Sequence, residues 1–235
     1  MASVSKSLSQ PTPSDAGSVS VDQGILWDKS ARRTLWLQIC SAYFLLQAAL
    51  WTPPGPLEIV WIVLAMLTIL GFAFSGRYSL REMGLARPSL RGTLWILGVG
   101  LAMTAAIPVI AALTHGNEAP THALPFRTAW RYGLWAVEQQ FILQSFFYVR
   151  LETLLGSRRA VWLATLLFAS THIPSPVLTV GTVLAGFFFC EMFRRFRTIF
   201  PLGVVHAAMG LTMAASFSDS LLHHMRVGLG YLHFP

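Results

Sequence analysis

Residues 57–75 read LEIVWIVLAMLTILGFAFS, a stretch in which Glu58, near the start, is the only charged side chain. An α-helix advances about 1.5 Å per residue, so about 20 mostly apolar residues cross the hydrocarbon core of a bilayer. The length and composition of this stretch therefore predict a transmembrane α-helix.

Other apolar stretches follow the same pattern, and charged residues, prolines and glycines separate them. They span residues 34–51, 93–113, 130–149, 160–173, 177–193 and 199–216. The stretch at 160–173 is short for a full crossing, so we expect it to end within the membrane or in a polar cavity. With 54% hydrophobic and only 11% charged residues, against about 25% charged in soluble domains, the chain is expected to be all-α. We predict one polytopic membrane bundle of about seven transmembrane helices, with six to eight as the range.

The distribution of basic residues predicts how the bundle is oriented. If the N-terminus is cytoplasmic, all but Arg127, Arg131 and Arg226 of the 17 Lys and Arg residues lie on the inner side, as the positive-inside rule requires. Residues 1–29, rich in Ser and Pro, are expected to form a disordered cytoplasmic tail. The membrane domain should cover residues 30–216, and residues 217–235 should form a short C-terminal tail. We expect a multi-pass integral membrane protein, in the inner membrane if the source is bacterial.

The net charge of +7 does not indicate a nucleic-acid partner, because the Lys and Arg residues sit between apolar stretches and no basic stripe interleaved with aromatic residues is present. The lipid bilayer is the expected partner, and the sequence does not determine an oligomeric state. The two cysteines, Cys40 and Cys190, lie in apolar stretches and are expected to be packing residues.

Among the ionisable residues of the predicted membrane helices, three stand out as candidates for a functional site. They are Glu138, His172 and His206. Such groups cost roughly 2.5–3.5 kcal/mol on insertion scales and mark functional sites by default. Glu191 is different, because Arg194 and Arg195 lie one turn away and an ordinary ion pair at the helix end explains it.

These three residues suit hydrolytic chemistry. Glu138 is the candidate general base that takes a proton from water, and two neutral imidazoles can orient that water or stabilise an oxyanion. This interpretation requires no cofactor. A three-ligand zinc site made of Glu138, His172 and His206 is the alternative, although the HExxH helix typical of such sites is absent from the sequence.

The segment from Glu138 to Gly210 resembles the CAAX-protease and bacteriocin-processing superfamily of intramembrane endopeptidases, also called CPBP or Abi proteins. The resemblance is carried by Glu138-Gln139, by Phe168-Ala-Ser-Thr-His172 and by His206-Ala-Ala-Met-Gly210. It implies a protease similar to the type II CAAX prenyl proteases, with a protease-like core at about residues 130–216 in which Glu138, His172 and His206 are catalytic. The implied substrate is a membrane-associated protein or peptide, cleaved at a CAAX-type tail, a leader or a C-terminal anchor.

The chain departs from the family pattern at three positions. Gln139 replaces a second Glu, Leu143 replaces an Arg and Gly210 replaces an Asn. Supporting roles are expected for Gln139, Phe168 and Gly210, and the candidates to replace the missing Asn are Thr171, Ser145 and Gln140. These departures leave a non-catalytic membrane scaffold or chaperone as the main alternative. A transporter is a weaker one, because paired halves with broken helices are not evident.

Overall fold

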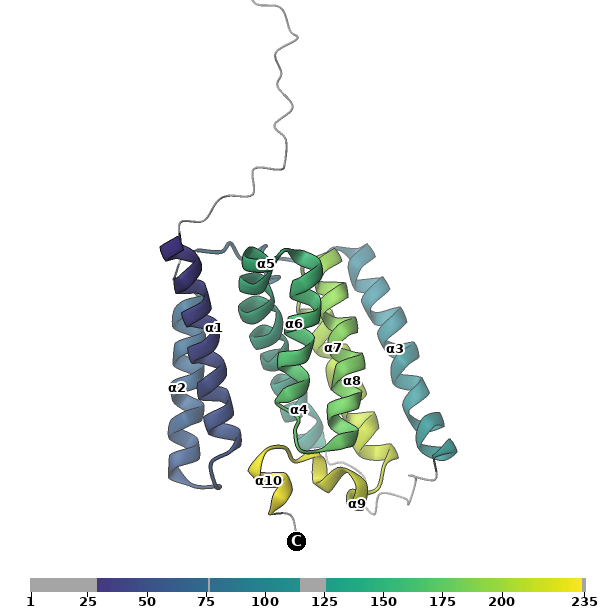
Figure 1. Ribbon diagram of the computed structural model, residues 1–235. Helices are drawn as coiled ribbons and strands as arrows, with labels where there is room; N and C mark the ends of the chain where they lie inside the picture. The colour runs from purple at the N-terminus through teal and green to yellow at the C-terminus, as the bar shows by residue number, and fades with distance from the viewer. Residues whose placement is uncertain (1–28, 76, 115–125, 234–235) are drawn as a thin grey trace, which may run out of the picture.

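The computed structural model describes residues 29–75, 77–114 and 126–233, and within these ranges all regular secondary structure is helical (Figure 1). The predicted N-terminal tail lies almost wholly outside the described residues. The elements are α1 (Lys29–Leu50), α2 (Pro56–Ala73), α3 (Leu90–Leu113), α4 (Phe126–Gln140), the π-helix η2 (Phe141–Tyr148), α5 (Val149–Leu155), α6 (Ser157–Ser170), α7 (Pro176–Phe196), α8 (Phe200–Ser216), α9 (Asp219–Leu222), the 3₁₀-helix η3 (His223–Met225) and α10 (Leu229–Leu232).

The fold is a helical membrane bundle. The helices α1, α2, α3, α6, α7 and α8, together with the continuous rod α4–η2–α5, coincide with the seven apolar stretches of the sequence. Three of them, α2, α3 and α7, are long and apolar enough to cross a membrane, and α8 is apolar but shorter. Large apolar side chains such as Leu67 and Leu94 are exposed on α2 and α3, as expected of surfaces that face lipid.

Local sequence signals determine where the helices begin and end. The side chain of Ser89 caps α3 by accepting the backbone N–H of Gly92 at 3.1 Å, and Ser175 caps α7 before Pro176. These caps satisfy backbone donors that a helix N-terminus leaves open. Gly156 separates α5 from α6 with a φ of 82°, a conformation that glycine adopts without steric cost.

Arg150 joins three helices inside the bundle. The sequence pattern groups it with the inner loops, yet its side chain is fully buried. Its guanidinium donates to Oε1 of Gln38 on α1 at 2.9 Å, to the carbonyl of Phe72 on α2 at 2.7 Å and to the carbonyl of Phe146 at 3.2 Å. A buried charge is costly unless its donors are paired. The contacts with Gln38 and Phe72 therefore hold α1 and α2 against the α4–η2–α5 rod, and the contact with Phe146 lies within the rod.

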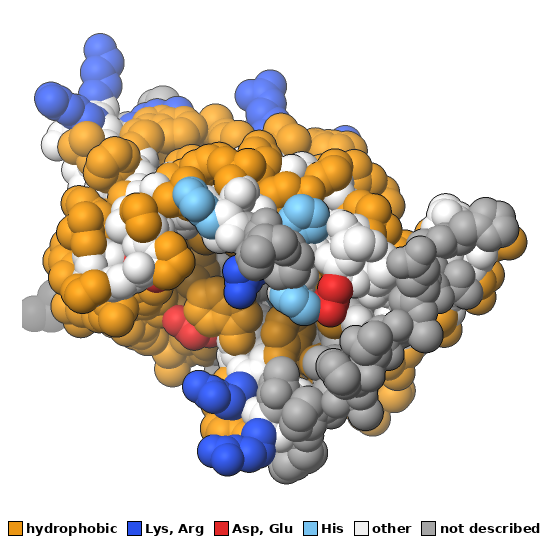
Figure 2. Space-filling view, turned by 90° about the horizontal axis from the view of Figure 1, so that it is seen from below, with side chains coloured by type: hydrophobic (Ala, Val, Ile, Leu, Met, Phe, Trp, Pro, Cys, Tyr) orange, Lys and Arg blue, Asp and Glu red, His pale blue; other side chains and the backbone are white. Residues whose placement is uncertain are grey.

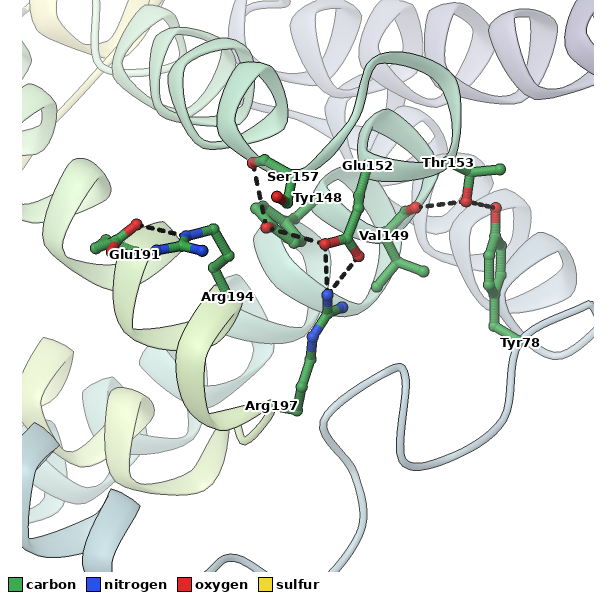
Figure 3. Close-up of polar contacts among 9 residues, drawn as sticks. All are labelled: Tyr78, Tyr148, Val149, Glu152, Thr153, Ser157, Glu191, Arg194 and Arg197. Atoms are coloured by element: carbon green, nitrogen blue, oxygen red, sulfur yellow. Dashed lines mark hydrogen bonds and ion pairs between the residues drawn. The ribbon is translucent and has the colours of Figure 1, made fainter. Parts of the chain in front are cut away.

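Ion pairs cluster at the end of the bundle where α5 and α7 meet (Figure 3). Arg197, which follows α7, pairs with Glu152 of α5, whose carboxylate also accepts the hydroxyl of Tyr148 at 3.3 Å. Glu191 pairs with Arg194 at 2.7 Å and with Arg195 at 2.6 Å. The predicted ion pair at the end of this helix is therefore confirmed.

The π-helix η2 changes the direction of the side chains that follow Gln140. Hydrogen bonds in a π-helix run between residues five apart instead of four, so the faces of α4 do not continue unchanged into α5. One consequence is the position of Ser145, which is fully buried and donates to the carbonyl of Met83 at 2.6 Å. Ser145 thereby fixes the loop between α2 and α3.

The C-terminal residues 217–233 fold across one end of the bundle, below the helices in Figure 1. The backbone N–H of Gly228 donates to the carbonyl of Ile173 at 2.9 Å. Figure 2 shows this end of the bundle, where hydrophobic side chains dominate the upper and left part of the surface and histidine side chains lie near the centre. The region predicted as a short tail is therefore packed against the loop that follows α6.

Candidate active site

A cavity of about 730 Å³ lies inside the bundle, with walls from α1, α2, α3, α4, α6, α7 and α8. Its lining is mostly apolar, and Phe217, Met225 and Val227 of the C-terminal segment close part of it. The polar side chains that line it are Tyr43, Glu58, Tyr132, Gln139, Thr171, His172, Thr182 and His206. A mostly apolar cavity with a few polar groups is typical of a ligand or substrate site.

His172 lies just after the end of α6, where the chain turns toward α7. Its Nδ1 is 2.9 Å from the backbone carbonyl oxygen of Phe168. A carbonyl oxygen only accepts hydrogen bonds, so Nδ1 carries the proton and the neutral ring has its lone pair on Nε2. His172 is therefore arranged to accept a proton or hydrogen bond from a molecule in the cavity.

His206 lies within α8 and is only 8% exposed. The amide nitrogen of Gln140, on α4, lies 3.2 Å from its Nδ1. Because an amide nitrogen only donates, Nδ1 of His206 is the acceptor and the proton of the neutral ring lies on Nε2. Nε2 of His172 is therefore a hydrogen-bond acceptor, whereas Nε2–H of His206 is a donor.

Phe168 holds both histidines around one aromatic ring. The centroid of its ring is 4.9 Å from that of His172 and 5.8 Å from that of His206, and both pairs meet edge to face. Thr171 lines the cavity beside them and donates its hydroxyl to the Phe168 carbonyl at 2.7 Å. The intact Phe168–His172 motif therefore builds one wall around both imidazoles.

Glu138 and Gln139 point to different sides of α4. Gln139 lines the cavity with both histidines, whereas Glu138 is not among the lining residues. Successive residues of a helix are rotated by about 100°, and Glu138 shares its side of α4 with the exposed Leu134. Among the described residues, no hydrogen bond or ion pair engages the Glu138 carboxylate. His172, His206 and Gln139 thus line the same cavity, and Glu138 lies on the adjoining side of α4.

Gln140 and Gln144 extend the site into the core. Both are fully buried, and the amide nitrogen of Gln144 lies 3.5 Å from Oε1 of Gln140 and 3.6 Å from Sγ of Cys190 on α7. The sequence analysis named Gln140 as a candidate to replace the missing Asn. In the structure its amide contacts Nδ1 of His206, so Gln140 orients the ring of His206.

Glu138, His172 and His206, the predicted zinc ligands, do not converge on one point. No group of three or more His, Cys, Asp or Glu side chains gathers around one point in the described ranges. The residues predicted as ligands are divided between the cavity wall and the flank of α4, so they do not fit a three-ligand site as they stand.

The fold and the cavity define a helical membrane protein with a pair of histidines on the wall of an internal apolar chamber. Comparison with protein families finds that residues 134–212 match the family described as type II CAAX prenyl endopeptidase Rce1-like. This match confirms the family resemblance that the motifs predicted, and it covers Glu138, His172 and His206. The matched family is a protease family. Comparisons with curated proteins and with solved structures returned no match.

Proposed function

We propose that this chain is a multi-pass intramembrane endopeptidase with its N-terminus in the cytoplasm. Its substrate would be a membrane-associated protein or peptide, cut at a CAAX-type tail, a leader or a C-terminal anchor. The observation that supports this proposal most directly is the large apolar cavity lined by His172 and His206, two histidines of the matched segment whose hydrogen bonds at Nδ1 fix opposite neutral tautomers. An apolar chamber suits a lipid-embedded substrate, and the histidine pair supplies the polar chemistry.

The proposed reaction begins with a water molecule held between the two imidazoles. Nε2 of His172 accepts a proton as the water oxygen attacks the scissile carbonyl carbon. The electron pair of the carbonyl double bond moves to its oxygen, and Nε2–H of His206 donates to the resulting oxyanion. When this intermediate collapses, the C–N bond breaks and His172 returns the proton to the leaving nitrogen. The products are a carboxylic acid and an amine.

The family resemblance implies that Glu138 is the general base, whereas the reaction above gives this role to His172. Two variants distinguish these alternatives. Acting as a base would require the Glu138 side chain to reach around α4 into the cavity. If Glu138 is the base, Glu138→Gln abolishes cleavage. If His172 is the base, Glu138→Gln retains most of the activity and His172→Ala removes it.

Cleavage of tagged peptides by purified protein in detergent or nanodiscs tests the proposal. The panel contains prenylated and unprenylated C-terminal tails, leader peptides and anchor peptides, and wild type is compared with His172→Ala, His206→Ala and Glu138→Gln. Loss of cleavage in both histidine variants at unchanged thermal midpoints supports the proposed site. Wild type that cleaves no member of the panel, or histidine variants that cleave normally, would contradict it.

One observation favours a second candidate, a protein that binds such substrates without cleaving them. The amide of Gln140 on α4 contacts His206 and the neutral Gln139 lines the cavity, whereas the Glu138 carboxylate does not line it. Binding of a prenylated peptide with no cleavage by wild type, and with a phenotype that survives His172→Ala, would support this second candidate.

A further inference from the structure

The hydroxyl of Tyr132 occupies a position on α8 that a side chain would otherwise fill. Tyr132 extends from α4 toward Gly210, and a Cβ atom at Gly210 would overlap the Tyr132 hydroxyl and lie 2.5 Å from its Cζ. Gly210 lies four residues after His206, which places it one helical turn away, about 6 Å along the helix axis. The phenol therefore enters the cavity wall beside His206 because Gly210 has no side chain.

The packing of α4 against α8 explains how this approach arises. Gly203 lies seven residues before Gly210, on the same side of α8. A Cβ at Gly203 would come 2.6 Å from Cγ2 of Val137 on α4. Small residues allow membrane helices to approach closely, so the two glycines admit Val137 and Tyr132 from the facing helix. The position of Tyr132 is thus built into the helix pair.

The hydroxyl of Tyr132 differs from that of Tyr43, the other tyrosine on the cavity wall. The Tyr43 hydroxyl lies 2.6 Å from Oγ of Ser170 and 2.6 Å from the amide nitrogen of Gln47. In the described part of the chain, no hydrogen bond engages the Tyr132 hydroxyl. A phenol in a mostly apolar chamber usually finds a hydrogen-bond partner, so the Tyr132 donor is available for a molecule in the cavity.

We propose that Tyr132 is a catalytic residue that donates a hydrogen bond to the scissile carbonyl oxygen as it becomes an oxyanion. This inference rests on the proposed function. Nε2–H of His206 and the hydroxyl of Tyr132 form a pair of donors one turn apart on the same wall, and the water attacks from His172. Tyr132 gives up no proton in the reaction, since its role is to stabilise the negative charge that develops on the oxygen.

Steady-state kinetics of Tyr132→Phe test this assignment, with Tyr78→Phe as the matched control outside the cavity wall. Loss of one oxyanion donor lowers kcat by about 100-fold, so Tyr132→Phe should show a fall of this order at nearly unchanged KM. Tyr78→Phe should retain wild-type kcat within about threefold, because its hydroxyl lies 3.1 Å from Oγ1 of Thr153, away from the cavity. Thermal midpoints verify that both variants are folded.

Inhibitor binding provides a readout that a merely structural role would not move. A peptidyl phosphonate mimics the tetrahedral intermediate and should lose affinity in Tyr132→Phe by a factor similar to the fall in kcat. An uncleavable substrate analogue should bind both proteins equally. If wild type cleaves and Tyr132→Phe cleaves at the same rate, the assignment is refuted and the proposed function stands. If wild type hydrolyses no substrate, the proposed function itself fails and the catalytic role of Tyr132 fails with it.

Discussion

The amide nitrogen of Gln140 lies 3.2 Å from Nδ1 of His206, so a residue on α4 determines which nitrogen of a histidine on α8 carries the proton. Both side chains are buried, and Oε1 of Gln140 is itself approached by the amide nitrogen of Gln144 at 3.5 Å. The orientation of His206 thus depends on a chain of neutral amides that leads away from the cavity.

Replacing Gln140 with Leu should release His206 from this constraint. Both tautomers would then be populated, and kcat should fall by at least about tenfold with little change in KM, because substrate-binding groups are untouched. Nitrogen-15 chemical shifts of labelled histidine should report the loss of a single tautomer. An unchanged spectrum and unchanged kcat in Gln140→Leu would show that Gln140 does not orient His206.

The buried guanidinium of Arg150 predicts a stability effect at Gln38. Gln38→Leu removes the acceptor at 2.9 Å from Nε of Arg150 and leaves a buried charged group without one of its partners. Such a loss costs about 1–3 kcal/mol, and more for charged groups, so the thermal midpoint in detergent should fall clearly. Ser41→Ala on an exposed position of α1 is the control and should change stability by less than about 0.5 kcal/mol.

The two acidic residues at the α5–α7 end of the bundle should differ in their effect on stability. Glu152 pairs with Arg197 across two elements, whereas Glu191 pairs with Arg194 and Arg195 within α7. Ion pairs within a helix contribute about 0.3–0.5 kcal/mol, so Glu191→Gln should have a small effect. Glu152→Gln also removes the acceptor of the Tyr148 hydroxyl and should lower the thermal midpoint more. Equal midpoints for the two variants would contradict this prediction.

Glu82, in the loop between α2 and α3, should make a pH-dependent contribution to stability. Its carboxylate accepts the backbone N–H and the hydroxyl of Ser79, each at 2.7 Å, and these hydrogen bonds hold its pKa below its usual value. A pKa that is lower in the folded state contributes stability above the unfolded pKa of about 4.3, and this contribution disappears as the pH falls through the folded value. The difference in thermal midpoint between wild type and Glu82→Gln should therefore shrink from pH 7 to pH 3.5. A difference that persists at pH 3.5 would argue against this contribution.

Gly228 should control how the C-terminal segment docks on the bundle. It has a φ of 57°, and a Cβ atom there would overlap the carbonyl oxygen of Leu50 at the end of α1. Gly228→Ala should therefore loosen residues 217–233 and speed their digestion by added protease. Gly230→Ala is the control, because its Cβ would meet nothing closer than Cβ of Arg226 at 4.0 Å. Equal digestion rates for the two variants would contradict this prediction.

Composition and periodicity predicted the fold closely, because lipid leaves the backbone few choices other than apolar helices. The seven apolar stretches became the helical rods, and Glu191 pairs with the arginines one turn away as expected. The depth of Arg150 was not predictable, since an arginine beside other basic residues resembles a loop residue until three helices supply its acceptors.

At the candidate site, spacing placed His172 and His206 in one cavity, but it could not determine which side of α4 faces them. Residues adjacent in sequence differ by about 100° around a helix, so the prediction of Glu138 as the catalytic base and Gln139 as a supporting residue rested on residue type and not on which of them faces the cavity. Tyr132 was missed because its significance depends on a glycine 78 positions later in the chain. A tyrosine opposite a small residue on a partner helix is a signal visible only once the helix pair is known.

The π-helix η2 divides the rod α4–η2–α5 into two parts, and it changes the number of residues that separates them. Gln140 belongs to the part that contacts His206, and Arg150 belongs to the part that binds α1 and α2. In a homologue whose rod is α-helical throughout, the spacing between the equivalent side chains should be shorter by one residue. A sequence alignment that matches Arg150 would then place Gln140 one residue away from its structural equivalent. Deleting a single residue within 141–148 should therefore convert η2 to α-helical hydrogen bonding, while Gln140 keeps its contact with His206 and Arg150 keeps its contacts with α1 and α2.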